Sequence, residues 1–249
     1  MLALDPPPVL FTFNFGDPVP THISIDMASH MCFNPEAAEW RFRKEGPHAH
    51  GPSPALSFHR LLPDYSESRL HSLPSLASEL GVGHVLIKDE SNRFGLPSFK
   101  VLGASWAVYR AVAHHLGCDV DGEFDDGNAL ERLAARAKGS ELRIVTATAG
   151  NWGRAVARMA KYLGVRCMVH VPSDMPETTR ALIRGEGAEV VGVEDGDYDV
   201  AAEAAKRHGQ AAGSLLVLDI GWEGFEAVPK VCLSNGPRES PPRRRDSRC

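Results

Sequence analysis

Residues 89–100 read Asp-Glu-Ser-Asn-Arg-Phe-Gly-Leu-Pro-Ser-Phe-Lys, and they join an apolar strand to an apolar helix. The strand is expected at 85–88 and the helix from 100 to about 116, so Lys100 falls in the first helical turn. An amine at such a junction can be partly removed from water, which disfavours its charged form. A neutral lysine amine is a nucleophile that forms Schiff bases with aldehydes. Most lysines are solvated surface charges, however, and position alone does not separate the two interpretations.

Downstream of this loop, strands and helices alternate regularly. Apolar and β-branched runs predict strands at 143–148, 166–171, 189–193 and 215–219. Helices are expected between them at 151–163, 176–184 and 198–208, with Gly164 ending the first and Asp197 capping the last. Further helices are expected to start at Pro74 and to cover 129–137, the latter inside an acidic connection over 117–141. The pattern is typical of a parallel sheet with flanking helices and right-handed crossovers, so the fold class is α/β.

Three segments resemble a single enzyme family. Residues 88–103 read KDESNRFGLPSFKVLG, residues 146–157 read TATAGNWGRAVA, and residues 219–226 read DIGWEGFE. In this order and spacing they are similar to diaminopropionate ammonia-lyases. These belong to the tryptophan-synthase-β-like (fold type II) enzymes that depend on pyridoxal 5'-phosphate. The resemblance extends over roughly residues 32–231.

The resemblance implies roles for particular residues. Lys100 matches the lysine that carries the cofactor, and Asn151 matches the asparagine that contacts the pyridoxal 3′ oxygen. The loop with Thr148, Gly150 and Asn151 matches the one that holds the substrate carboxylate, and a helix N-terminus is suited to an anion. A glycine turn between strand and helix is the plain alternative for this loop.

Asp219 matches a second acid/base candidate of the family, and its expected place at the end of an apolar strand suits a ligand site. Capping of a helix or turn is an equally common use of aspartate, and both interpretations stay open.

Two residues of the second segment depart from the family pattern, which commonly reads Asp-Gly-Asn-His-Gly. This chain has Ala149 in place of the aspartate, which in the family acts as a base towards the D-isomer of the substrate, and alanine cannot take a proton. Trp152 replaces the histidine, and it is expected to change the wall of the pocket.

The family's glycine-rich phosphate loop, which follows the lysine at a distance, has no counterpart here. After Gly224 the next glycine is Gly236, and a phosphate cup needs several converging amides. The chain is therefore expected to lack the C-terminal half of the large domain. The expected division is a Pro-rich extension with little structure (1–35), the N-terminal part of the large domain with the lysine (36–104), a small α/β domain (105–222), and a large-domain remnant with a disordered basic tail (223–249).

Composition narrows the class of protein. The chain has 249 residues, 43% of them hydrophobic and 24% charged, as in ordinary globular proteins. A net charge of −5 argues against a general nucleic-acid binder. Five scattered cysteines, no Lys or Arg before Arg41 and no long apolar run favour a cytoplasmic protein without a membrane segment.

Other polar motifs predict little. The histidines at 48, 50, 114 and 115 lack further ligands at metal spacing, so no metal site is expected. The basic residues Arg154, Arg158 and Lys161 are expected to form a solvated helix face. The glycines around Glu186 follow a helix instead of a strand, which weakens a dinucleotide-binding interpretation.

The sequence thus favours a pyridoxal-phosphate-dependent α,β-elimination on a small amino acid such as diaminopropionate, giving pyruvate and ammonia. By resemblance a homodimer is possible. Two alternatives remain: a non-catalytic α/β fragment, and a nucleotide-binding Rossmann-like domain.

Overall fold

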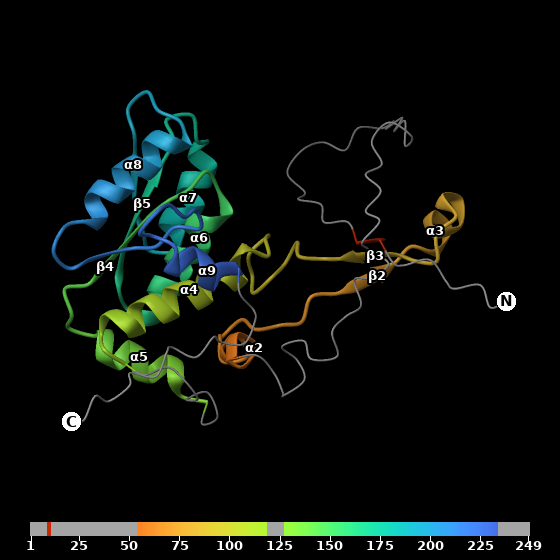
Figure 1. Cartoon of the computed structure of the whole chain (residues 1–249), viewed down its shortest axis with the longest axis horizontal. Coiled ribbons are helices and arrows are strands. Elements are labelled where there is room, and N and C mark those ends of the chain that lie inside the picture. The colour runs from red at the N-terminus through yellow and green to blue at the C-terminus, as the bar shows by residue number, and fades with distance from the viewer. Residues whose placement is uncertain (1–8, 11–53, 119–126, 234–249) are drawn as a thin grey trace, which may run out of the picture.

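The protein is seen here as a computed structural model that describes residues 9–10, 54–118 and 127–233 (Figure 1). Of the sequence predictions, the rest of the Pro-rich extension, the acidic run at 119–126 and the basic tail from 234 lie outside these residues. Within the extension, Val9–Leu10 forms a short strand, β1.

The centre of the fold is a parallel sheet of four strands in the order β6-β5-β4-β7. Its strands are β4 (Arg143–Ala147), β5 (Arg166–Val171), β6 (Glu189–Gly192) and β7 (Ser214–Leu216). The connecting helices are α6 (Asn151–Leu163), α7 (Glu177–Gly185) and α8 (Tyr198–Gly209). The predicted alternation and the α/β class are confirmed. The last strand is shorter than predicted and ends at Leu216 instead of 219.

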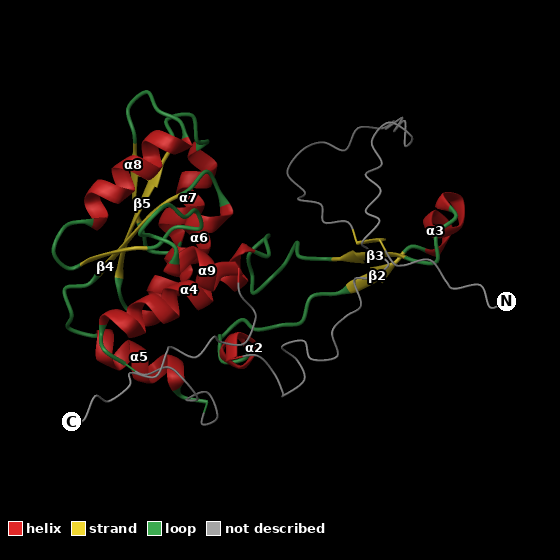
Figure 2. Cartoon of the chain, viewed as in Figure 1, coloured by secondary structure: helices red, strands yellow, loops and turns green. Residues whose placement is uncertain are grey.

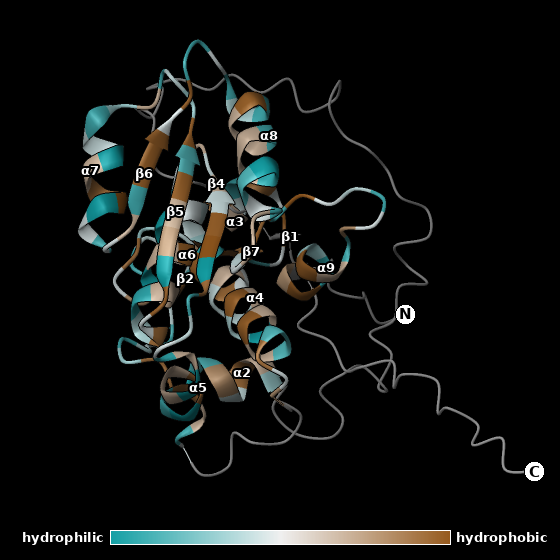
Figure 3. Cartoon of the chain, turned by 90° about the vertical axis from the view of Figure 1, so that its left-hand side faces the viewer, coloured by the Kyte–Doolittle hydropathy of each residue, from teal (hydrophilic) through white to brown (hydrophobic). Residues whose placement is uncertain are grey.

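Helices cover both faces of this sheet (Figure 2). On one face, α4 (Lys100–His115), α5 (Ala129–Ala137) and α6 bury a core with Ile144 and Val169 of the strands. On the other face, alanines of α8 pack against Val145 and Ala147. Figure 3 shows the apolar strands between helices whose outer faces are hydrophilic. A sheet buried on both sides explains why its strands read as continuous apolar runs.

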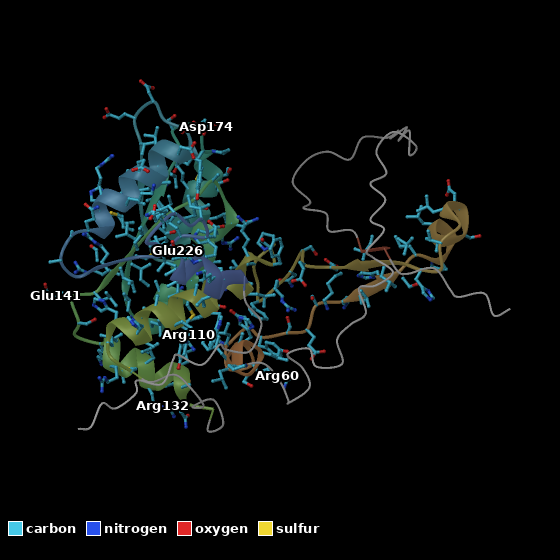
Figure 4. The ribbon with its side chains drawn as sticks, viewed as in Figure 1. Arg60, Arg110, Arg132, Glu141, Asp174 and Glu226 are labelled. Carbon is cyan, nitrogen blue, oxygen red and sulfur yellow. The ribbon has the colours of Figure 1, made fainter. Side chains whose placement is uncertain are left out.

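The strand order reverses between β4 and β7. The chain adds β5 and β6 on one side of β4, then crosses by α8 to place β7 on the other side. In open α/β sheets, ligands bind at the carboxyl edge where the order reverses. Figure 4 shows the two ends of this sheet, with Glu141 before β4 and Asp174 after β5. The edge after β4 and β7 is therefore where a site is expected.

A second, smaller sheet lies in an arm that projects from this body (Figure 1). Here β3 (Val85–Lys88) pairs in parallel with β1 and antiparallel with β2 (Leu70–Ser72). The arm also carries α3 (Pro74–Leu80), which ends at Gly81 as predicted. The sheet is therefore mixed, and β2 is an addition to the predicted strands.

Two short helices complete the described fold. Helix α2 (Pro54–His59) packs its buried Phe58 beside Trp106 and Tyr109 of α4. Helix α9 (Ala227–Leu233) packs so closely on α4 that a side-chain carbon on Gly103 would lie 3.0 Å from the Cys232 carbonyl oxygen. The predicted domain boundary between 104 and 105 falls inside α4, and the division into domains stays a prediction.

Candidate functional site at the carboxyl edge of the sheet

Lys100 and Asp219 meet at this edge although 119 residues separate them. The Lys100 Nζ donates to the Asp219 Oδ2 at 3.3 Å, and the lysine side chain is 41% exposed. The amine is thus only partly removed from water, and a carboxylate faces it. The pair brings a primary amine and a carboxylate together at a place that solvent reaches.

The position of Asp219 follows from the strand register. Strands β4 and β7 align Arg143 with Ser214 and Val145 with Leu216, and the Val217 amide still donates to the Val145 carbonyl. Continued by the same offset, this register places Asp219 beside Thr148. Asp219 lies three residues beyond the end of β7, and this register predicts a place next to the loop that follows β4.

That loop holds the residues matched to a carboxylate site. The buried Thr148 Oγ1 accepts from the Gly150 amide at 2.9 Å and donates to the Gly150 carbonyl at 3.0 Å. Asn151 is exposed and begins α6, and no side chain caps this helix end. Amides in the first turn of a helix have no partner within the helix, so they are available to an anion.

Gly153 is a site-shaping residue that the sequence interpretation missed. A side-chain carbon there would lie 2.3 Å from Thr148 Cγ2 and 2.8 Å from Val169 Cγ1, so only glycine fits. At Gly150, by contrast, such a carbon would meet nothing within 4 Å. Gly153 lets the first turn of α6 pack directly on the Thr148 loop, and a glycine inside a helix is the sequence signal for it.

Trp152 is buried, and the expectation that it changes the wall of the pocket stays a prediction. Its side chain is buried in the core, and its Nε1 donates to the Thr146 Oγ1 at 3.0 Å. The reason is the helical turn: Trp152 points back toward the sheet, while its neighbour Asn151 points outward.

Tyr198 and Cys232 are further neighbours of Asp219. Burial, followed by the charge of Asp219, raises the pKa of the Tyr198 hydroxyl and of the Cys232 thiol to about 12 each. Both groups therefore stay neutral near pH 7. No motif marks either residue, since they lie on α8 and α9 and reach Asp219 only through the fold.

The turn after Asp219 is fixed by aromatic stacking. Trp222 and Phe225 stack with ring centres 4.3 Å apart, and the Lys206 Nζ of α8 lies 4.2 Å from the centre of the Trp222 ring. A cation over an indole face is attracted by the ring. The Gly224 amide also donates to the Glu226 Oε1. This turn anchors the chain that carries Asp219 on α8.

The basic residues of α6 do not form the predicted solvated face. Arg154 and Arg158 both pair with Glu186, which is 5% exposed and lies just after α7. Burial opposes ionisation of Glu186, but hydrogen bonds from Arg158 and Arg154 hold its pKa below the usual value. Lys161 is exposed, as expected. The prediction failed because Glu186 is distant in sequence.

The described part of the chain contains neither a cluster of metal ligands nor a membrane-spanning helix. Within residues 9–10, 54–118 and 127–233, no three His, Cys, Asp or Glu side chains gather as metal ligands would. His48 and His50 lie outside these residues. Over the same ranges, no helix has the length and apolar character needed to cross a bilayer.

Comparison with known proteins shows which family the chain belongs to. Residues 61–227, well over half of the chain, match the model of the family described as "Pyridoxal-phosphate dependent enzyme". The chain belongs to this family. Its pyridoxal-phosphate dependent relatives include the diaminopropionate ammonia-lyase of Salmonella typhimurium, 40% identical over 70% of this chain and 42% of the relative. The Escherichia coli enzyme is 31% identical over 83% of this chain and 49% of its own length.

A solved structure of the Escherichia coli diaminopropionate ammonia-lyase, in complex with D-serine, superposes with a TM-score of 0.66. It is 31% identical, and the match covers 73% of this chain and 45% of that one. The chain thus spans about half the length of the relatives it matches. The tryptophan-synthase-β-like fold expected for the family is confirmed for the part that is present.

The residues of the site fit the aldehyde end of pyridoxal phosphate. Lys100 offers a primary amine that solvent can reach, and Asp219 at 3.3 Å can exchange a proton with it. Asn151, on the exposed first turn of α6, offers an amide side chain beside the same edge.

Proposed function

We propose that this protein takes part in pyridoxal-phosphate-dependent α,β-elimination from a small amino acid such as diaminopropionate, giving pyruvate and ammonia. The observation that carries the proposal is the contact of Lys100 with Asp219 at the carboxyl edge, where the sheet order reverses. Family membership over residues 61–227 supports it.

The division of labour follows from the chemistry of each residue. Pyridoxal phosphate, when bound, withdraws electrons from the carbon that loses its proton. Lys100 would hold the aldehyde through its amine while no substrate is bound, and its amine, once released by the incoming amino acid, would take the α-proton. Asp219, 3.3 Å from this amine, supplies a proton to the amine that leaves the β-carbon. The α C–H bond and the β C–N bond both break, one proton is taken up and one given, and hydrolysis of the released aminoacrylate by water gives pyruvate and the second ammonia.

The loop after β4 orients the substrate in this proposal. The free amides at the start of α6 favour the carboxylate by hydrogen bonding and by the helix dipole. The bonds between Thr148 and Gly150 keep the loop in one conformation, so little entropy is lost when the substrate binds. A homodimer and a cytoplasmic location remain predictions that rest on likeness to the family and on composition.

An absorbance titration tests the proposal. Pyridoxal phosphate is added to the 249-residue chain, and the spectrum is recorded near the visible edge with Lys100→Ala as the control. A new band that requires Lys100 supports the proposal. A spectrum that equals the sum of chain and free cofactor at every concentration contradicts it and favours a non-catalytic fragment. Nucleotide binding without such a band would favour the Rossmann-like alternative.

A further inference from the structure

Arg158 joins four segments of the chain. From α6, its guanidinium donates to the Glu186 Oε1 at 2.8 Å and pairs through Nε with Glu186 Oε2. Its Nη1 lies 3.3 Å from the Asp64 Oδ2 and 3.3 Å from the Phe94 carbonyl oxygen. The side chain is only 17% exposed. Such a many-partner, partly buried arginine is expected to be rigid because its planar group has several simultaneous acceptors.

Phe94 belongs to a tight turn that needs support. Arg93 and Leu96 exchange two backbone hydrogen bonds of 2.7 Å and 2.9 Å, with Phe94 and Gly95 between them. Phe94 has φ of 51° and Gly95 has φ of 71°. A left-handed conformation is strained for phenylalanine and persists only where the surroundings hold it. The Phe94 ring is buried beside Tyr65, and its carbonyl is held by Arg158.

This turn leads directly to Lys100. Pro97 restricts the backbone that follows the turn, and the buried Ser98 accepts from the Lys100 amide through its Oγ at 3.2 Å. A shift of the 93–96 turn therefore moves the start of α4 and the amine of Lys100. Three residues, Pro97, Ser98 and Phe99, separate the turn from Lys100.

We infer that Arg158, locked in place by Glu186, is a positioning residue for Lys100. It ties the turn at 93–96 to α6, the helix whose first residues form the substrate loop of the proposed site. The inference rests on the proposed function in one respect: the position of Lys100 matters because Lys100 is proposed to bind the cofactor. The hydrogen bond between Arg158 and the Phe94 carbonyl fixes the position of the first turn of α4 relative to the first turn of α6.

Arg154 provides a matched control. It lies one turn earlier on α6, pairs with the same Glu186 at 2.9 Å and has a similar exposure of 19%. The contacts of Arg158 with Asp64 and with the turn at Phe94 set the two arginines apart. If amide protection near Lys100 depends only on the ion pairs of Glu186, it should fall in variants of either arginine. If it depends on the contact of Arg158 with the turn, it should fall only in variants of Arg158.

The experiment is amide hydrogen exchange of the full chain, without cofactor, for wild type, Arg158→Gln and Arg154→Gln. We expect the Leu96 and Lys100 amides to exchange roughly 10-fold faster or more in Arg158→Gln, and the α4 interior at 105–112 to stay as in wild type. In Arg154→Gln all of these amides should stay within about 2-fold of wild type. Unchanged exchange at Leu96 and Lys100 in Arg158→Gln, or an equal rise in both variants, overturns the inference.

A second variant decides the case if Arg158→Gln does not fold. Arg158→Lys keeps the charge and the pairing with Glu186, but one ammonium cannot span Glu186, Asp64 and Phe94 together. Faster exchange confined to 93–100 is the expected result, and full protection there contradicts the inference.

Borohydride trapping of pyridoxal phosphate then gives a readout that a purely structural role would not change. We expect a lower share of label on Lys100 relative to exposed Lys161 in Arg158→Lys, and an unchanged share contradicts the inference. Label absent from Lys100 in the wild type would instead count against the proposed function, while the exchange result still decides the role of Arg158.

Discussion

At the scale of single residues, two glycines at the junction of β4 and α6 differ in the space around them. The sequence pointed to Gly150, but a side-chain carbon there would meet nothing within 4 Å. Gly153 has no such space, because Thr148 and Val169 already touch it. Packing therefore requires glycine at 153, whereas it leaves room for a side chain at 150.

Gly153→Ala should destabilise the protein by about 1–3 kcal/mol, the usual cost of overpacking a well-filled site. Gly150→Ala is the matched control, and its effect should stay within about 0.5 kcal/mol. Urea unfolding followed by circular dichroism measures both. Equal midpoints for the two variants would show that the close contact of α6 with Thr148 is not needed for stability.

Ala149 sets the expected stereochemistry. It is exposed in the loop between β4 and α6, where the family commonly has an aspartate that acts on the D-isomer. Loss of a general base typically lowers a rate by a factor of about 10²–10⁴. In a form of the protein that turns over diaminopropionate, the L-isomer should therefore react and the D-isomer should react far more slowly. Ala149→Asp should raise the rate on the D-isomer, and similar rates of the unmodified protein on both isomers would refute this.

At the scale of elements, helices and strands with marked ends could be predicted. Helix 151–163 and strand 166–171 match the structure because Gly164, in the left-handed conformation, ends the helix sharply. Strand β2 could not be predicted, since its three residues are all exposed and show no alternation. The last strand was predicted too long because its buried residues 217 and 218 continue the apolar run past Leu216.

The sequence pointed to candidate site residues one by one, and their roles stay predictions, but it did not show how these residues lie relative to one another. The family-like segments identified Lys100, Thr148, Gly150, Asn151 and Asp219, while only the strand register brings Asp219 beside Lys100 and the loop. The partners of the α6 arginines come from Glu186 and Asp64, far away in sequence. No local pattern carries that information.

The contact between β5 and α8 makes stability depend on pH. His170 of β5 is 1% exposed and stacks on His208 of α8 with ring centres 4.8 Å apart, and neither ring nitrogen of His170 has a hydrogen-bond partner in the described part of the chain. Burial, then the charges of His208 and Arg207, lowers the pKa of His170 to about 4.

Unfolded histidine takes up its proton near pH 6.5, whereas His170 resists it until about pH 4. The unfolded state therefore binds more protons in this window, and stability should fall as the pH drops from 6.5 toward 4, by about 2 kcal/mol at pH 5. His59, whose pKa burial also lowers to about 4, adds a similar loss. His170→Leu should remove its share, which urea midpoints at pH 7 and pH 5 would measure. An identical pH dependence in the variant would contradict this account.

At the scale of the whole molecule, the described chain carries the amine end of the proposed site on one face of an α/β body. The arm with β2, β3 and α3 leaves Leu70, Leu76 and Leu80 exposed, with Leu70 at 57%. The chain covers less than half of the Salmonella relative. Whether a preparation of residues 1–249 retains the cofactor therefore decides whether it can be active.

We expect that preparation to hold pyridoxal phosphate weakly and to turn over little or no diaminopropionate. No glycine-rich loop follows Gly224 within it, and each hydrogen bond to a charged group contributes roughly 1.5–3 kcal/mol, so the loss of several weakens binding by orders of magnitude. Dialysis followed by measurement of bound cofactor and of ammonia release tests this. Stoichiometric cofactor after dialysis together with steady turnover would overturn it.

The central claim is that Lys100 is the amine that carries the cofactor, and borohydride trapping tests it most directly. The chain is incubated with excess pyridoxal phosphate, reduced, digested and mapped by mass spectrometry, with Lys100→Ala treated in parallel. The account predicts that the label lies on the peptide containing Phe99-Lys100 and that Lys100→Ala abolishes it. Label on a different lysine, or an equal yield from Lys100→Ala, would contradict it.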